Sequence, residues 1–133
     1  MAGETDISKL IQGLKPRLNE GTYVFSSVKT LDDIAREHTI CEFKEREGTT
    51  LILEQQKAEE FQLPYDYSAA WITLEIHSSL ETVGLTAIFS NELAKNGISC
   101  NVIAGYFHDH IFVAKNDAEK AMKVLTVLSE NNR

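Results

Sequence analysis

Two histidines flank an aspartate in His108-Asp109-His110, and this cluster is the one best suited to hold a metal ion. Residues at i and i+2 of a strand point to the same face, so both imidazoles could bind one ion, with His77 as a conceivable further ligand. Neither an HExxH motif nor a closely spaced cysteine pair accompanies them, and an isolated HxH pair is a nonspecific signal. We expect these histidines to face solvent or an interface, and we predict no metal and no other cofactor.

Nucleophilic side chains are present, but the motifs that would activate them are not. Cys100 could pair with a histidine, and Ser78 could pair with His77. Neither lies in a nucleophile elbow or a cysteine-protease motif. The phosphate-binding GxxxxGK loop and the GxGxxG dinucleotide motif are absent. The sequence therefore predicts that the protein is not an enzyme.

Composition and charge restrict the partners. The chain has 133 residues, 20 acidic against 13 basic, and a net charge of −7, which would repel a phosphate backbone. Cys41 and Cys100 lie far apart and are expected to be reduced thiols. No signal peptide and no apolar run of membrane-spanning length is seen, so we expect a cytoplasmic protein without a nucleic-acid or membrane partner.

The first half of the chain predicts short elements. Apolar residues from Ile7 to Leu14 recur at helical spacing behind Thr5 and Asp6, which can cap a helix, and Pro16 ends it. Pro64 begins a linker to the second half. The other predicted elements are strands over 22–28, 38–46 and 49–55, a weak helix over 30–36 and a helix over 56–62.

The second half has a clearer pattern, with the order βαββα. Apolar and polar residues alternate over 71–77, which predicts a strand. Ser78 and Glu81 form a capping box for a helix that runs to Asn96, where Gly97 suits a left-handed stop. The remaining elements are strands over 98–107 and 110–115, a turn near His108-Asp109 and a last helix that Asn116 caps.

The two halves resemble each other. Residues 50–60 align with 110–120 at an offset of 60, and 23–27 align with 72–76 at an offset of 49. The first copy is therefore shorter by 11 residues, and the missing residues correspond to part of the long helix of the second copy. The sequence predicts an α+β fold of two βαββα modules, 1–63 with the leading helix and 64–133, each with an antiparallel sheet covered by helices on one face.

Three segments of the second half resemble an ACT domain: Leu74–Ala87, Asn96–Val102 and His108–Val113. They contain a first strand and loop, a helix opening on Val-Gly-Leu, and an Asn-Gly-Ile turn into the second strand. The resemblance is closest to small tandem ACT-like proteins and more distant to aspartate kinases and CASTOR-type arginine sensors. It implies ferredoxin-like modules, and it covers residues 71–128 well and 22–61 weakly.

The resemblance also implies a function. ACT modules commonly bind an amino acid between two modules, near the first strand–helix connection, where free helix N–H groups can donate to a carboxylate. By resemblance, Asn101 would offer an amide and Asp109 would pair with an ammonium or basic group. A homodimer is expected, since such modules tend to associate. The implied ligand-binding residues are Ser78, Ser79, Val83, Gly84, Leu85, Asn101 and Asp109.

Each of these residues also has a purely structural interpretation. Ser78 and Glu81 are explained by a helix cap, Gly84 by tight packing of a helix on the sheet, and Asn101 by simple exposure on a strand. The hypotheses are accordingly an amino-acid sensor, a ligand-free module for protein association, and a metal-binding protein or hydrolase. The first is favoured.

Overall fold

The computed structural model describes residues 6–76 and 82–131. The chain divides into two compact units, which we call unit 1 (residues 1–19 and 70–133) and unit 2 (residues 20–69). The leading segment thus packs with the second half, although it belongs to the first module in sequence. The module boundaries at residues 63 and 64 remain a prediction about sequence modules, because compactness divides the chain differently.

In unit 1, β5 (Ser68–Leu74) lies between β1 (Pro16–Leu18) and β7 (Asp109–Ala114), and β6 (Asn101–Ala104) is the outer neighbour of β7. The pairs β1–β5 and β6–β7 are antiparallel. Side chains alternate along these strands, so each strand contributes residues to two faces. On one face lie Ile72, Leu74, Ile111 and Val113, all at most 1% exposed.

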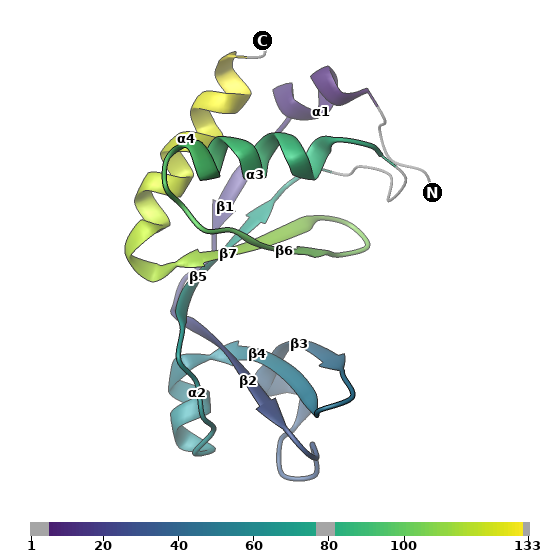
Figure 1. Cartoon of the computed structure of the whole chain (residues 1–133), viewed down its shortest axis with the longest axis vertical. Helices are drawn as coiled ribbons and strands as arrows, with labels where there is room; N and C mark the ends of the chain where they lie inside the picture. The colour runs from purple at the N-terminus through teal and green to yellow at the C-terminus, as the bar shows by residue number, and fades with distance from the viewer. Residues whose placement is uncertain (1–5, 77–81, 132–133) are drawn as a thin grey trace. The chain divides into compact units, whose positions relative to one another are not determined.

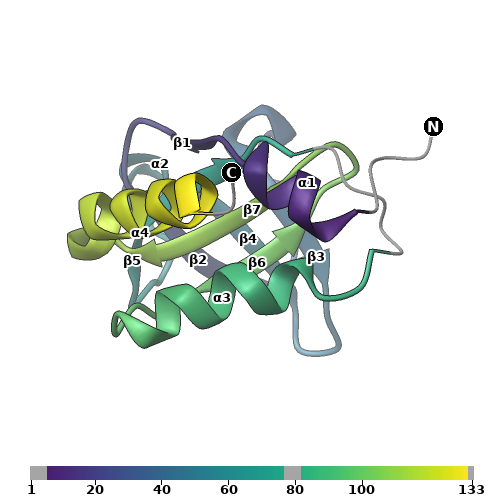
Figure 2. The same ribbon diagram turned by 90° about the horizontal axis from the view of Figure 1, so that it is seen from above.

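Three helices pack against that apolar face: α1 (Ile7–Gln12), α3 (Leu85–Lys95) and α4 (Ala118–Asn131) (Figures 1 and 2). Each helix repeats apolar residues at a spacing of about one turn, which makes one buried stripe. The buried residues that the three helices contribute to this core are Leu10, Ile11, Leu85, Phe89, Leu93, Ala118, Ala121 and Leu125.

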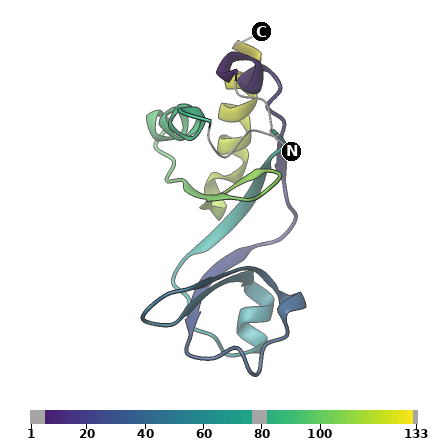
Figure 3. The same cartoon turned by 90° about the vertical axis from the view of Figure 1, so that its right-hand side faces the viewer.

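Unit 2 repeats the design on a smaller scale. Its strands follow the order β3 (Thr39–Lys44), β4 (Thr49–Glu54), β2 (Tyr23–Val28), and the first two residues of β5 pair with Tyr23 and Val24. The helix α2 (Gln55–Glu60) lies against β2 and β4 (Figure 3). The core residues here are Val24, Ile34, Leu51, Leu53 and Ala58.

The internal repeat is visible in the structure. The strands β4 and β7 begin at Thr49 and Asp109, at the same offset of 60 as in the sequence alignment of the two halves. Their hairpin loops close with equivalent bonds, from the amide of Glu45 to the carbonyl of Gly48 and from Gly105 to His108, both 2.9 Å long. The predicted α+β fold of tandem ferredoxin-like modules is confirmed.

The helix predicted over 30–36 is wrong. This segment contains turns, and only a 3-10 helix, η1 (Arg36–His38), follows it. Seven residues give a helix few hydrogen bonds to offset the cost of nucleation, and the Thr30 hydroxyl accepts the Asp32 amide in a competing local turn. Ile34 covers the sheet in place of a helix and is 8% exposed.

The start of α3 differs from the prediction. The helix begins at Leu85, and its N-cap residue is Gly84 in the left-handed region, with φ of +96°, not Ser78. The capping pair Ser78 and Glu81 lies outside the described residues. The conformation of Gly84 explains the start at Leu85: its positive φ lies outside the right-handed helical region, so the helix does not include Gly84.

Two shorter elements were also misplaced. The strand β1 was not predicted, because three residues around Arg17 give no periodic signal, and it exists only through pairing with β5. The turn between β6 and β7 is a loop over 105–108, so Asp109 is the first residue of β7 and not a turn residue.

The leading helix is capped and anchored as a part of unit 1. Asp6 accepts the Lys9 amide at 3.2 Å, which confirms the predicted cap. At the other end, the Ser129 hydroxyl of α4 donates to the Gln12 carbonyl at 3.1 Å, and α1 lies against α4 (Figure 3). Ser129 is 3% exposed, so this bond satisfies a buried polar group.

Shortening Phe89 tests this core. Phe89 is 1% exposed between the helices and the sheet, so Phe89→Ala leaves a cavity and should lower the free energy of unfolding by about 3–5 kcal/mol. The matched control is Asn91→Ala on the exposed side of the same helix, which should change it by less than about 0.5 kcal/mol. Urea denaturation measures both, and equal losses would contradict the assignment of the buried face.

Candidate functional site

The start of α3 holds three of the predicted ligand-binding residues. Val83 is 86% exposed, and no described atom lies within 4 Å of the position that a Cβ of Gly84 would take. Leu85 is 4% exposed in the core, so only its backbone is available to a ligand. The Ile88 amide donates to the Gly84 carbonyl at 3.1 Å, which leaves the first-turn amides of Leu85, Thr86 and Ala87 without a partner within the helix. Ser78 and Ser79 lie outside the described residues.

The other two predicted residues lie on the β6–β7 hairpin, on opposite faces. Asn101 pairs with Phe112, and its side-chain amide donates to the Phe112 carbonyl at 3.5 Å. Asp109 shares the helix-facing side of the hairpin with Ile111 and lies three residues from Phe112, about 10 Å along the strand. The hairpin therefore does not bring Asn101 and Asp109 together.

The loop between β6 and β7 lies at the same end of unit 1 as the start of α3 (Figures 1 and 2), and Asp109 is the first residue of β7 after that loop. The carboxyl group is half-buried, and burial raises its pKa above the ordinary value. A half-buried carboxylate gains most from a cationic partner, because the partner replaces the lost hydration. Asp109 is thus suited to an ammonium group.

A polar network on the opposite face of the same sheet escaped the sequence analysis. The indole N–H of Trp71 donates to Nδ1 of His110 at 3.0 Å, and Oγ1 of Thr73 lies 3.2 Å from the same nitrogen. Nδ2 of Asn19 donates to Oγ1 of Thr73 at 2.9 Å. Thr73 is fully buried, so these bonds satisfy its hydroxyl group. The network connects β5 and β7 with the end of β1.

The network fixes the state of His110. An indole N–H can only donate, so Nδ1 accepts and the ring proton resides on Nε2. Burial lowers the pKa of His110, and the positive charges of His108 and Arg17 lower it further. Nδ1 is therefore occupied, and among residues 6–76 and 82–131 no three His, Cys, Asp or Glu side chains form a metal-binding group.

Gly105 allows the hairpin loop to close over this histidine. A Cβ at Gly105 would lie 2.8 Å from the His108 carbonyl oxygen and 3.2 Å from Nε2 of His110. The first distance is shorter than real Cβ atoms show and the second is tighter than most real contacts, so a side chain would push the loop away. Glycine is required at position 105 because His110 packs against it in the tertiary structure. The sequence spacing alone did not indicate this requirement.

The two cysteines are poor nucleophiles. Burial raises the pKa of Cys100 to about 11, and burial followed by the charge of Glu42 raises that of Cys41. At pH 7 about one Cys100 thiol in ten thousand is ionised, and the thiolate is the reactive form. Both are free thiols. Among the described residues no helix is long and apolar enough to span a bilayer.

Two ACT-domain family models match the chain in tandem, over residues 2–70 and 67–127. The chain belongs to the ACT domain family. Neither model describes a catalytic family, and ACT domains are regulatory. No curated protein matches the chain in sequence.

Solved structures agree with this assignment. A protein of unknown function from Vibrio cholerae, described as a possible transport protein, is 45% identical, with a TM-score of 0.84 over 92% of this chain and 95% of that one. A protein from Agrobacterium tumefaciens is 16% identical, with a TM-score of 0.72 over 87% and 89%. The regulatory subunit of aspartate kinase from Thermus thermophilus, 9% identical with a TM-score of 0.58 over 85% and 95%, shares the fold.

The pH dependence of stability tests the His110 network. Because the folded protein lowers the pKa of His110, the unfolded chain binds a proton more readily, and His110 stabilises the fold fully above the unfolded pKa of about 6.5. This contribution is lost as pH falls below that value toward the folded pKa. Urea denaturation between pH 7 and 5 should show a decline that His110→Asn reduces, since Asn retains an acceptor but does not titrate; identical declines would contradict the network.

Proposed function

We propose that this protein is a regulatory sensor that binds a free amino acid where two ACT modules meet. The observation that carries the proposal is the tandem of ACT domains over nearly the whole chain. Regulatory modules of this family commonly respond to amino acids. Unit 1 supplies the groups that such a ligand needs.

The start of α3 would receive the ligand carboxylate. Three first-turn amides at Leu85, Thr86 and Ala87 point along the helix axis, where the helix dipole adds a partial positive charge. Gly84 keeps the approach open, because it has no side chain and no described atom lies near the position that a Cβ would take. A small anion can therefore reach the amides.

Asp109 would receive the ligand ammonium or a basic side chain. It is the first residue of β7, on the same side of that strand as Ile111, and burial already disfavours its isolated charge. The carboxylate and the ammonium group of a free amino acid lie a few ångströms apart. One molecule could therefore pair its carboxylate with the α3 amides and its ammonium group with Asp109. Ser78, Ser79, Val83 and Asn101 would frame this ligand together with a second module.

A second function, protein association without a ligand, is favoured by one observation. Large apolar side chains stay exposed near the same end of unit 1: Val83 at 86%, Tyr106 at 65% and Phe107 at 60%. Such side chains mark contact surfaces when they gather. Under this function, assembly would not respond to any amino acid.

Thermal denaturation with a panel of the twenty amino acids tests the proposal. A ligand that binds only the folded protein stabilises it by about 2.7 kcal/mol at a hundredfold excess over Kd. We expect one amino acid, or a chemically related group, to raise the melting temperature. If none does so at millimolar concentration, the sensor function is wrong and the association function takes its place.

Substitutions at Gly84 test the carboxylate position. Gly84→Asp places a negative charge beside the first turn of α3 and should weaken amino-acid binding at least tenfold. Gly84→Asn is the matched control, since Asn has the same size and tolerates the same left-handed backbone but is neutral. Isothermal titration calorimetry compares the two variants. Equal affinities would place the ligand carboxylate elsewhere.

Substitution of Asp109 tests the other end of the ligand. Asp109→Asn removes the charge at constant shape, so the affinity for the amino acid should fall at least tenfold while the fold persists. Glu75→Gln, a charge removal on an exposed ion pair with Arg17, serves as the control and should leave affinity unchanged. An unaffected Asp109→Asn would remove this residue from the site.

A further inference from the structure

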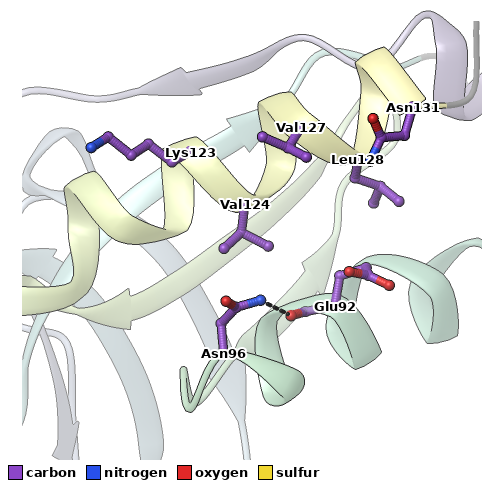
Figure 4. A pocket seen from close by; sticks show the side chains of 7 residues that line it. All are labelled: Glu92, Asn96, Lys123, Val124, Val127, Leu128 and Asn131. Atoms are coloured by element: carbon purple, nitrogen blue, oxygen red, sulfur yellow. Dashed lines mark hydrogen bonds between the residues drawn. The ribbon is translucent and has the colours of Figure 1, made fainter.

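A groove between α3 and α4 lies on the outer side of the helix layer of unit 1, with a volume of about 400 Å³ (Figure 4). Its lining residues are Glu92, Asn96, Lys123, Val124, Val127, Leu128 and Asn131. The floor is apolar and comes from three residues of α4. Val127 is 51% exposed, although it occupies a helix whose opposite side is fully buried.

The chain covers only a part of this helix layer. The leading helix α1 packs against α3 and α4 and is held by the Ser129–Gln12 hydrogen bond. Val124 and Leu128 are partly buried against the core, whereas Val127 is left exposed beside them. The groove is thus a segment of the α3–α4 surface that no described element of the chain covers.

The charges at the groove are of opposite sign and lie at opposite ends. Figure 4 shows Lys123 on α4 at one end and Glu92 on α3 at the other. Among the described residues Lys123 makes no ion pair, and the Glu92 carboxylate pairs with Lys95 of its own helix, at 3.1 Å. A two-fold axis through the midpoint brings each of these charges opposite the other in a second copy.

We propose that this groove is the face through which two copies of the chain associate. The apolar residues Val124, Val127 and Leu128 would pack across the axis, and two symmetric Lys123–Glu92 pairs would fix the register. The groove carries both Lys123 and Glu92, so its charges are complementary to those of an identical groove. A second copy of the chain is therefore the occupant that matches it best. The ligand-binding residues at the start of α3 are not among those that line it, so this association does not depend on the proposed amino acid.

Charge reversal tests the proposal on the full chain without any amino acid. Sedimentation equilibrium over a concentration series should show a dimer for the wild type. Lys123→Glu and Glu92→Lys each place like charges opposite each other twice, so each should raise the dimer dissociation constant about tenfold or more. The double variant restores both pairs and should dimerise like the wild type.

Mixing the two single variants gives the sharpest outcome. In a heterodimer, the chain with Lys123→Glu presents two carboxylates and the chain with Glu92→Lys presents two ammonium groups. An equimolar mixture should therefore dimerise more tightly than either variant does alone. Lys44→Glu, the same charge change at an exposed position of unit 2, should leave the wild-type dimer unchanged. Circular dichroism verifies that each variant is folded.

Two results would overturn the proposal. One is a wild-type chain that stays monomeric at every concentration. The other is a dimer that persists unchanged in both single variants, which would show that association uses another face. Either result leaves the amino-acid proposal intact, because that proposal is tested by ligand-dependent melting.

Discussion

Burial of one face of the β5–β7 pair is the constraint on which unit 1 depends. Ile72, Leu74, Ile111 and Val113 must be removed from water, and the helices supply the apolar surface that does so. Because side chains alternate along a strand, this burial directs Trp71, Thr73, His110 and Phe112 to the other face. The hydrophobic core and the polar network are therefore two consequences of one register.

The same alternation explains why the network is neutral. A fully buried hydroxyl of Thr73 needs partners, and the groups in reach are the Asn19 amide and the His110 ring. A protonated His110 would lose its acceptor at Nδ1 and would face Arg17 and His108, so the neutral ring is favoured. Its role is to join strands, which is a structural use of a histidine that in sequence resembles a metal ligand.

Different parts of α3 and α4 likewise form different surfaces. The inner sides of α3 and α4 build the core, the start of α3 presents free amides beside Gly84, and the outer groove presents Val127 between two opposite charges. These surfaces belong to different turns of the same two helices, so a regulatory ligand and a second copy of the chain can use them independently.

The sequence by itself determined the module order, the repeat and the family, because these depend on local periodicity: alternation over β5, the Asp6 cap, the left-handed Gly97 and the offset of 60 between β4 and β7. Only the tertiary structure decided which short segments become elements. β1 exists through its pairing with β5, and α3 begins only after the left-handed Gly84. His110 meets Trp71 and Thr73, and Asn19 meets the same two residues, through long-range packing. Such contacts join residues that are far apart in the chain, so local sequence patterns do not predict them.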